Sequence, residues 1–185
     1  MSRVRVVLDE FTCEDTEDYF VQDEFYVAGA VSDGSTSVGV LTKPIPVRNG
    51  QTKQFGVGGG TVFDADVADG RILKVALVAF DEDANKDWAQ HGQLVTKIGQ
   101  AVSAGLAAIP NPYTAEAAKI LPFAIAAVGG TMQLDRDDEL GQHLREFNIG
   151  QISNGTHGQE WSFQDRIIRF WSDWKYKVRY RIIKG

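Results

Sequence analysis

The stretches VALVAFDED (residues 75–83) and RDDELGQHLREF (residues 136–147) decide the fold of this chain. The first is an apolar run of strand length that ends in three acids, and the second opens on acids and then alternates in the manner of a strand. A long, largely apolar segment separates them in the sequence. If that segment leaves and returns at one point, the two acidic clusters form one loop between two strands. We therefore expect both clusters at the same end of a β-sheet.

Other segments of the chain also have the two-residue period of β-strands. RVRVVLDEF (residues 3–11) and EFYVAGAVS (residues 24–32) place apolar residues on one face, and WKYKVRYRI (residues 174–182) alternates almost throughout. Asn49 and Asp69 are each followed by glycine, a pair typical of tight turns. At 185 residues the chain is long enough for a full sandwich core. These features predict a mainly β protein, an antiparallel β-sandwich that forms one domain over residues 1–185.

The segment between the two acidic clusters changes to a helical period. Five apolar residues recur every three or four positions, which would align them on one face of a helix: Leu94, Ile98, Val102, Leu106 and Ile109. The sequence PNPY (residues 110–113) breaks this pattern, and Thr114 can cap a second helix that ends at Gly129. We therefore expect an inserted α-helical hairpin over about residues 88–130.

The expected hairpin has two interpretations. Its apolar face could insert shallowly into a bilayer, or open a pore together with other copies of the chain. Alternatively, the apolar face packs on the sandwich or on a second subunit, which would give a homo-oligomer through the helical hairpin. The sequence alone leaves both interpretations open.

Charge and cysteine content narrow the function classes. A net charge of -6 argues against nucleic acid as the main partner, because phosphate binding needs a dominant basic surface. Residues 9–24 hold eight acids and no base, and residues 166–184 hold seven bases and one acid, so we expect separate acidic and basic surfaces.

Cys13 is the only cysteine and lies among acids that disfavour its thiolate, so we expect a buried, unreactive side chain. No apolar run reaches the roughly 20 residues of a membrane-spanning helix, and no signal peptide is recognised.

Motifs of known enzymes are not found in the sequence. His91, His143 and His157 do not have the spacing of metal ligands, and no serine stands in a Gly-x-Ser-x-Gly motif. Paired carboxylates could in principle hydrolyse a glycoside, but acidic crowding without a sugar-stacking cleft is weak evidence for that reaction. We therefore expect a protein that is not an enzyme.

The order of the acidic motifs resembles that of the C2 domain, the calcium- and phospholipid-binding β-sandwich. In that family a strand ends in Asp-x-Asp, as Asp81 and Asp83 do here, and Asp-x-x-Gly opens the next strand, as Asp138 and Gly141 do. The segment QDEFYV (residues 22–27) is similar to the end of the first calcium loop. The chain departs from the family in two ways: glutamate replaces a proline within QDEFYV, and the expected hairpin enlarges the third calcium loop. The resemblance implies a C2-like β-sandwich that carries a helical insertion.

The resemblance also implies a Ca²⁺ site between two acidic loops. The implied metal ligands are the carboxylates of Asp23, Asp81, Asp83 and Asp138, with Asp18 or Asp15 completing the shell and Asp87 and Asp137 close by. The chemistry supports this interpretation independently, because calcium takes six to eight oxygen ligands and crowded carboxylates repel one another without a cation. The alternative is a solvated acidic rim that only aids solubility.

The last expected strand carries the candidate membrane-binding residues. Its bases fall on one face, where they could attract an anionic phospholipid surface: Lys175, Lys177, Arg179 and Arg181. Alternatively, these charges protect a sheet edge against aggregation. The sequence therefore predicts a soluble, calcium-dependent module that binds phospholipid at the membrane periphery. A membrane-damaging toxin or effector that uses the hairpin is one alternative, and a structural or protein-interaction module is another.

Overall fold

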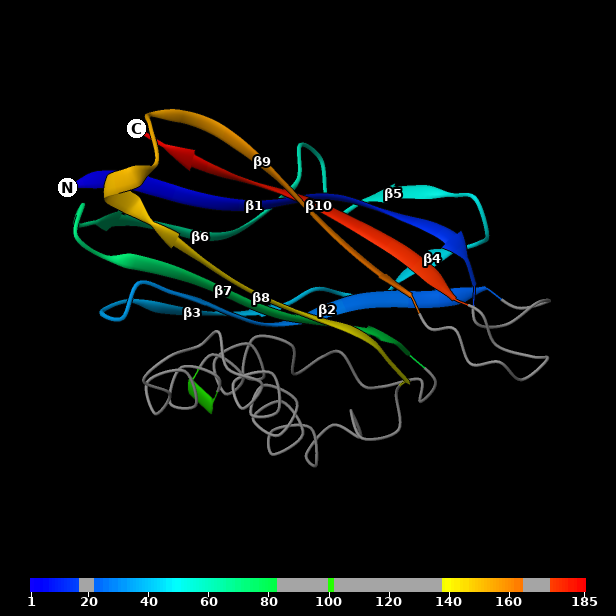
Figure 1. Ribbon diagram of the computed structural model, residues 1–185. Helices are drawn as coiled ribbons and strands as arrows, with labels where there is room; N and C mark the ends of the chain where they lie inside the picture. Colours follow the sequence, from blue (N-terminus) through cyan, green and yellow to red (C-terminus); the bar gives the residue numbers. More distant parts are fainter. Residues whose placement is uncertain (17–21, 83–99, 102–137, 165–173) are drawn as a thin grey trace.

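A computed structural model describes residues 1–16, 22–82, 100–101, 138–164 and 174–185. This part of the chain is mainly β and forms two antiparallel sheets that pack as layers of a sandwich (Figure 1). Sheet A has the strand order β5-β1-β10-β9, with β6 also paired to β1. Its strands are β1 (Ser2–Asp15), β5 (Thr52–Gln54), β6 (Gly60–Val67), β9 (Gly155–Gln164) and β10 (Lys175–Lys184).

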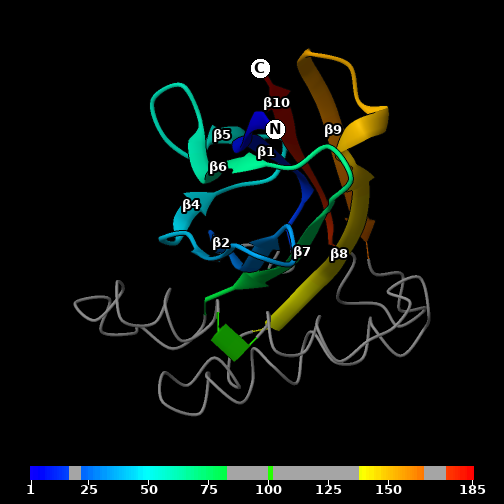
Figure 2. The same ribbon diagram turned by 90° about the vertical axis from the view of Figure 1, so that its left-hand side faces the viewer.

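Sheet B has the strand order β3-β2-β7-β8, with β4 also paired to β2. Its strands are β2 (Asp23–Ser32), β3 (Ser37–Leu41), β4 (Ile45–Val47), β7 (Ile72–Asp81) and β8 (Asp138–Asn148). Figure 2, turned by 90°, shows sheet A above sheet B, with β8 rising through the short 3-10 helix η3 (Ile149–Gln151) to β9. The two sheets are therefore connected on this side by β8 of sheet B and β9 of sheet A, which follow one another along the chain.

The alternation predicted for the first and last strands is present in sheet A. Val6 of β1 lies opposite Ile182 of β10, and both side chains are fully buried between the sheets. Among their chain neighbours, Arg5 is exposed and Arg181 and Ile183 are partly exposed, whereas Val7 is buried. Sheet A therefore has one apolar and one charged face, as expected for an antiparallel sheet with one face in water.

Aromatic rings from both sheets fill the interior near one end of the sandwich. The ring of Phe25 on β2 stacks on Phe11 of β1 at 4.2 Å between centroids and on Tyr176 of β10 at 5.2 Å. Phe163 of β9 stacks on Tyr176 at 5.9 Å. Phe11, Phe25 and Tyr176 are fully buried, and burial of each such side chain contributes roughly 1.5–3 kcal/mol to folding.

Two polar side chains on the inner face of β10 link it to β8 and the corner that follows. The Tyr180 hydroxyl and His143 Nε2 of β8 lie 2.8 Å apart in a buried hydrogen bond. The Lys184 ammonium donates to the carbonyl oxygens of Ile149 and Ile152, at 2.8 and 2.9 Å. These bonds satisfy polar groups that would otherwise be costly to bury.

Both predicted glycine turns are found. Gly50 has a φ of 75°, a left-handed conformation that glycine adopts without strain, and the second turn lies at residues 69–70 between β6 and β7. Gly141 serves another purpose, because a Cβ at this position would lie 2.8 Å from Cδ2 of Phe163. The glycine of the Asp-x-x-Gly sequence therefore allows β8 to approach the aromatic interior closely.

The predicted fold class needs one correction, because the inserted α-helical hairpin is not found. The described residues form β-strands and a 3-10 helix, and no α-helical element is present among them. Of the predicted range 88–130, only residues 100 and 101 are described; they have helical backbone but are too few to form an element. The prediction was wrong for the described fold, because apolar spacing indicates only that a segment has one apolar face and does not by itself establish a helix.

Candidate functional site

Three of the predicted metal-binding acids belong to strand ends that meet at one end of sheet B. Asp81 is the last residue of β7, and the register pairs it with Asp138, the first residue of β8, and with Phe25 of β2. Asp23, the first residue of β2, lies two residues before Phe25. Figure 1 shows these strand ends together on the right, beside the end of β1 and the start of β10. We call this region the acidic end.

Asp23 is held by a tyrosine of the opposite sheet. Its side chain is buried, and its carboxylate accepts a short hydrogen bond from the Tyr176 hydroxyl. Burial, and then the hydrogen bond to Asp23, raise the pKa of Tyr176 above its usual range. The phenol therefore remains a neutral donor that binds the carboxylate across the interior.

Cys13 of β1 lies next to Tyr176 and is fully buried, as predicted. Burial raises the pKa of its thiol to about 12; a hydrogen bond with Tyr176 opposes the shift, and the charges of Asp23, Asp15 and Asp81 add to it. A thiol with this pKa carries almost no thiolate at neutral pH. Cys13 is therefore a packing residue of the acidic end and not a nucleophile.

Asp81 and Asp15 are also bound by donors of the protein. The backbone N–H of Glu24 donates to Oδ1 of Asp81 at 2.7 Å, and Nδ2 of Asn49 donates to Oδ1 of Asp15 at 3.0 Å. Asp81 is buried, whereas Asp15 is partly exposed at the end of β1. The acidic end therefore combines two buried carboxylates, those of Asp23 and Asp81, with a more accessible one.

The acidic end does not by itself provide a calcium site in the part of the chain that is described. No group of three or more candidate ligand side chains comes together there. Asp138 is described only as a residue of β8, and Asp18, Asp83, Asp87 and Asp137 lie outside the described residues. Two buried carboxylates fall short of the six to eight oxygens that calcium takes. The predicted ligand set therefore stays a prediction.

The predicted membrane-binding bases lie on the outer face of β10, next to acids of β1 and β9. The ion pairs are Lys175 with Glu14, Lys177 with Glu14 (3.3 Å) and Glu160 (3.8 Å), Arg179 with Glu10 (2.8 Å) and Glu160 (3.3 Å), and Arg181 with Asp9 (3.0 Å). Four bases thus face four acids. The expectation of separate acidic and basic surfaces is wrong here, because strand pairing sets β1 beside β10.

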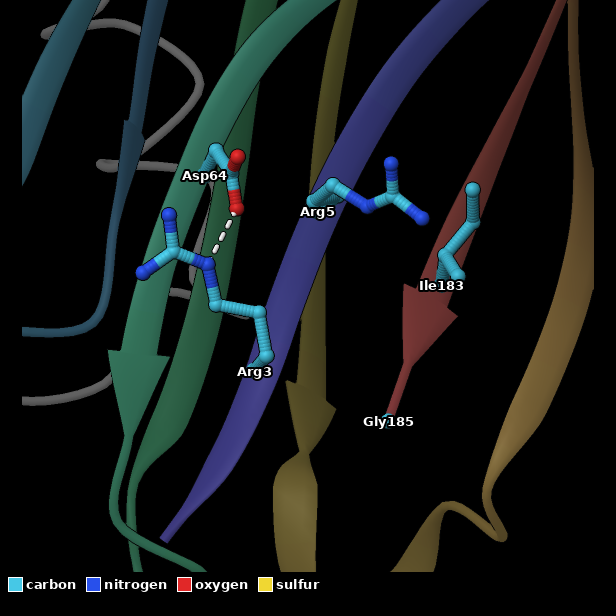
Figure 3. Close-up of a pocket in the computed structure, with 5 residues that line it drawn as sticks. All are labelled: Arg3, Arg5, Asp64, Ile183 and Gly185. Carbon is cyan, nitrogen blue, oxygen red and sulfur yellow. Dashed lines mark hydrogen bonds and ion pairs between the residues drawn. The ribbon is translucent and has the colours of Figure 1, made fainter.

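A hollow of about 280 Å³ lies at the opposite end of sheet A (Figure 3). It is lined by Arg3, Arg5, Asp64, Ile183 and Gly185. Nε of Arg3 donates to Asp64 at 2.6 Å, and Figure 3 shows the Arg5 guanidinium on the side of Ile183. The hollow is open to solvent and far along β1 from the acidic end, so it adds nothing to the predicted site.

The sequence did not identify Tyr176 and His143 as polar partners inside the sandwich. The alternation of residues 174–182 does set Tyr176 on the apolar face of its strand, but its hydroxyl partner belongs to the other sheet. His143 stacks on Trp161 at 5.1 Å between ring centroids and bonds Tyr180. No local pattern marks such contacts, because they depend on the separation of the two sheets.

The chain was compared with known proteins at three levels. No family model matches it, and no curated protein does. Among solved structures it is similar to a chain described as "Structure of a C2 domain", with 13% identity and a TM-score of 0.37 over 100% of this chain and 99% of that chain. Within the described residues, no helix is both long and apolar enough to span a bilayer. The sandwich itself is established by its strand pairing, and membership of the C2 family stays a prediction.

Proposed function

We propose that this chain is a calcium-dependent phospholipid-binding module whose cation is held at the acidic end. The observation that carries the proposal is the strand register, which sets Asp81 opposite Asp138 and brings the start of β2, with Asp23, to the same end of sheet B. Acids that follow or precede these strand ends in sequence add further carboxylates: Asp15, Asp18, Asp83, Asp87 and Asp137. Such a set of carboxylate oxygens is the kind that calcium prefers.

The residues around the acids would orient them for this role. The Tyr176 hydroxyl and the Glu24 N–H each donate to a buried carboxylate, which fixes the orientation of that carboxylate. Fixed ligands lose less conformational freedom on binding. A bound Ca²⁺ would supply positive charge that offsets the repulsion between acids and attracts the phosphate oxygens of lipid headgroups.

The bases of β10 would contribute less to membrane attraction than the sequence alone suggests. An exposed base near an anionic membrane contributes about 1 kcal/mol when it is not already neutralised. Lys175 and Lys177 share Glu14, and Arg179 lies between two acids. Attraction to anionic lipid would therefore depend mainly on calcium at the acidic end.

Thermal unfolding with and without calcium tests the metal part of the proposal. A ligand that binds only the folded chain stabilises it by about 2.7 kcal/mol at one hundred times its Kd. For 185 residues this corresponds to a rise in Tm of about 7 °C. The double variant Asp81→Asn/Asp83→Asn should lose this rise, yet without calcium it should be no less stable than the parent, because like-charge repulsion is relieved. Asp64→Asn is the matched control, since Asp64 is exposed and bonds Arg3 at the other end of sheet A.

Sedimentation with vesicles tests the membrane part. The parent chain should sediment with phosphatidylserine vesicles in calcium and be released by a chelator, and the double variant should remain in the supernatant. Vesicles of phosphatidylcholine alone should bind less, because they lack net negative charge. If calcium leaves the melting curve unchanged and no vesicle binding occurs, the acids are a solvated rim and a structural or protein-interaction role is the better account.

A further inference from the structure

The outer face of sheet B differs in kind from the outer face of sheet A. On β2 and β7 the register pairs Tyr26 with Phe80, Ala28 with Val78, and Ala30 with Ala76. Residues at alternate positions on the same strands, such as Val27 and Leu77, belong to the core between the sheets. The three cross-strand pairs therefore lie on the face of sheet B that points away from sheet A.

These outward side chains are nevertheless buried. Tyr26, Ala28 and Val78 are 0% exposed and Phe80 is 6% exposed. The rings of Tyr26 and Phe80 stack at 5.2 Å between centroids. On β3, Leu41 lies opposite Ala28 and is also buried, so the apolar surface extends over three strands.

The sequences of the strands also differ between the two sheets. FYVAGAV in β2 and VALVAF in β7 are continuous apolar runs, which are typical of strands buried on both faces. KYKVRYRI in β10 alternates and directs its bases toward water. We call the surface formed by Tyr26, Ala28, Ala30, Leu41, Ala76, Val78 and Phe80 the outer apolar face. Proteins rarely leave a contiguous apolar surface of this kind in water, so it needs a cover.

We propose that the outer apolar face is the docking surface for residues 83–137 of the same chain, which form a third layer on sheet B. The path of the chain supports this occupant. The segment begins after β7, which contributes to the face, and ends at β8, the strand paired with β7. Two antiparallel neighbours need only a few residues to connect them, and the 55 residues present exceed that need many times.

The composition of the segment matches the surface. Residues 102–130 contain only two charged side chains, Glu116 and Lys119. A stretch this apolar is itself unfavourable in water, and covering the outer apolar face would bury both surfaces at once. The inference does not depend on calcium or on any particular conformation of the segment. A second copy of the chain and a lipid surface are the other candidate occupants.

Thiol labelling of single-cysteine additions tests whether the face is covered in the monomer. Val78→Cys reports on the outer apolar face, and Ser162→Cys is the matched control on the exposed outer face of sheet A. The parent chain serves as the blank, because Cys13 is buried. We expect Val78→Cys to react at least about 100-fold more slowly than Ser162→Cys, at every protein concentration and without lipid. Equal rates would overturn the proposal, and so would protection that disappears on dilution or that requires vesicles.

Photocrosslinking identifies the occupant. A diazirine amino acid of leucine size at position 41 should fit the face without enlarging a side chain, and the same probe at Ile183 is the control on sheet A. Mass spectrometry of the monomer band should find crosslinked peptides from residues 83–137 for position 41 and not for position 183. Crosslinks confined to a dimer band, or to peptides outside this segment, would show that another occupant covers the face.

Discussion

Replacing Tyr176 by phenylalanine should destabilise the fold by removing one hydroxyl. The ring would stay in place, because its stacking on Phe25 at 5.2 Å and on Phe163 at 5.9 Å does not involve the oxygen. The main loss is at Asp23, whose buried carboxylate accepts the hydroxyl's hydrogen bond, and the weaker hydrogen bond with the Cys13 thiol is lost as well. A hydrogen bond to a charged group contributes about 1.5–3 kcal/mol, and we expect a loss near 2 kcal/mol in the free energy of unfolding.

The same β-strand offers a matched control in Tyr180→Phe. Tyr180 is also buried on the inner face of β10, but its hydroxyl is bonded to His143 at 2.8 Å. Burial, with a smaller contribution from the charge of Arg145, lowers the pKa of His143 to about 4, so this partner is neutral at pH 7. A bond between neutral groups contributes about 0.5–1.5 kcal/mol, so Tyr180→Phe should cost about half as much as Tyr176→Phe.

Urea denaturation followed by tryptophan fluorescence measures the free energy of unfolding of both variants, since the chain has four tryptophans. With about 2.1 cal/mol/K of unfolding entropy per residue, a loss of 2 kcal/mol over 185 residues lowers Tm by about 5 °C. Equal losses in the two variants would mean that the charge of Asp23 adds nothing to the bond. A smaller loss for Tyr176→Phe than for Tyr180→Phe would refute the reasoning altogether.

Two further predictions concern pH and backbone packing. His143 has its ordinary pKa of 6.5 when unfolded and a pKa of about 4 when folded, so the unfolded chain takes up the proton first. Stability should be full above pH 6.5 and fall by up to roughly 3 kcal/mol toward pH 4, and His143→Gln should remove this part of the pH dependence in denaturant titrations. Gly29→Ala should prevent folding or greatly lower Tm, because its Cβ would overlap the carbonyl oxygen of Ala76 on the paired strand. Gly50→Ala, with open space around it, should cost only about 1 kcal/mol; similar losses in both glycine variants would contradict the packing argument.

The strands that could be predicted are those long enough to show a period. β1 and β10 contain 14 and 10 residues, and their alternation indicates the inner and outer faces correctly for all of β10 and for β1 as far as Leu8, where a register shift changes the phase. β4 and β5 contain three residues each, which is too short for a period to be distinguished from chance. β4 pairs with β2 and β5 pairs with β1, and these pairings depend on strands that are distant in sequence. The local sequence of β4 and β5 therefore does not predict them.

The candidate site was predictable in its topology and not in its contacts. If the segment between the two acidic clusters leaves and returns at one point, the clusters are expected to meet. The register, which pairs Asp81 with Asp138, agrees with this expectation for these two residues. The partners of the acids were not predictable in the same way. The Tyr176 hydroxyl reaches Asp23 from another sheet, over 153 positions of sequence, and only the packed structure brings them together.

The ion pairs and the apolar faces have one physical cause, which is the position of each sheet in the molecule. β10 alternates because one face of sheet A meets water, and there its bases are balanced by acids on both neighbouring strands. β2 and β7 are apolar on both faces, since their outward residues, such as Ala28 and Val78, are buried as fully as the inward ones. A sequence that appeared to separate into acidic and basic regions thus folds into a nearly neutral outer sheet A and an acidic end. The proposed Ca²⁺ would therefore bind at the acidic end, and not on the outer face of sheet A, where acids and bases are already paired.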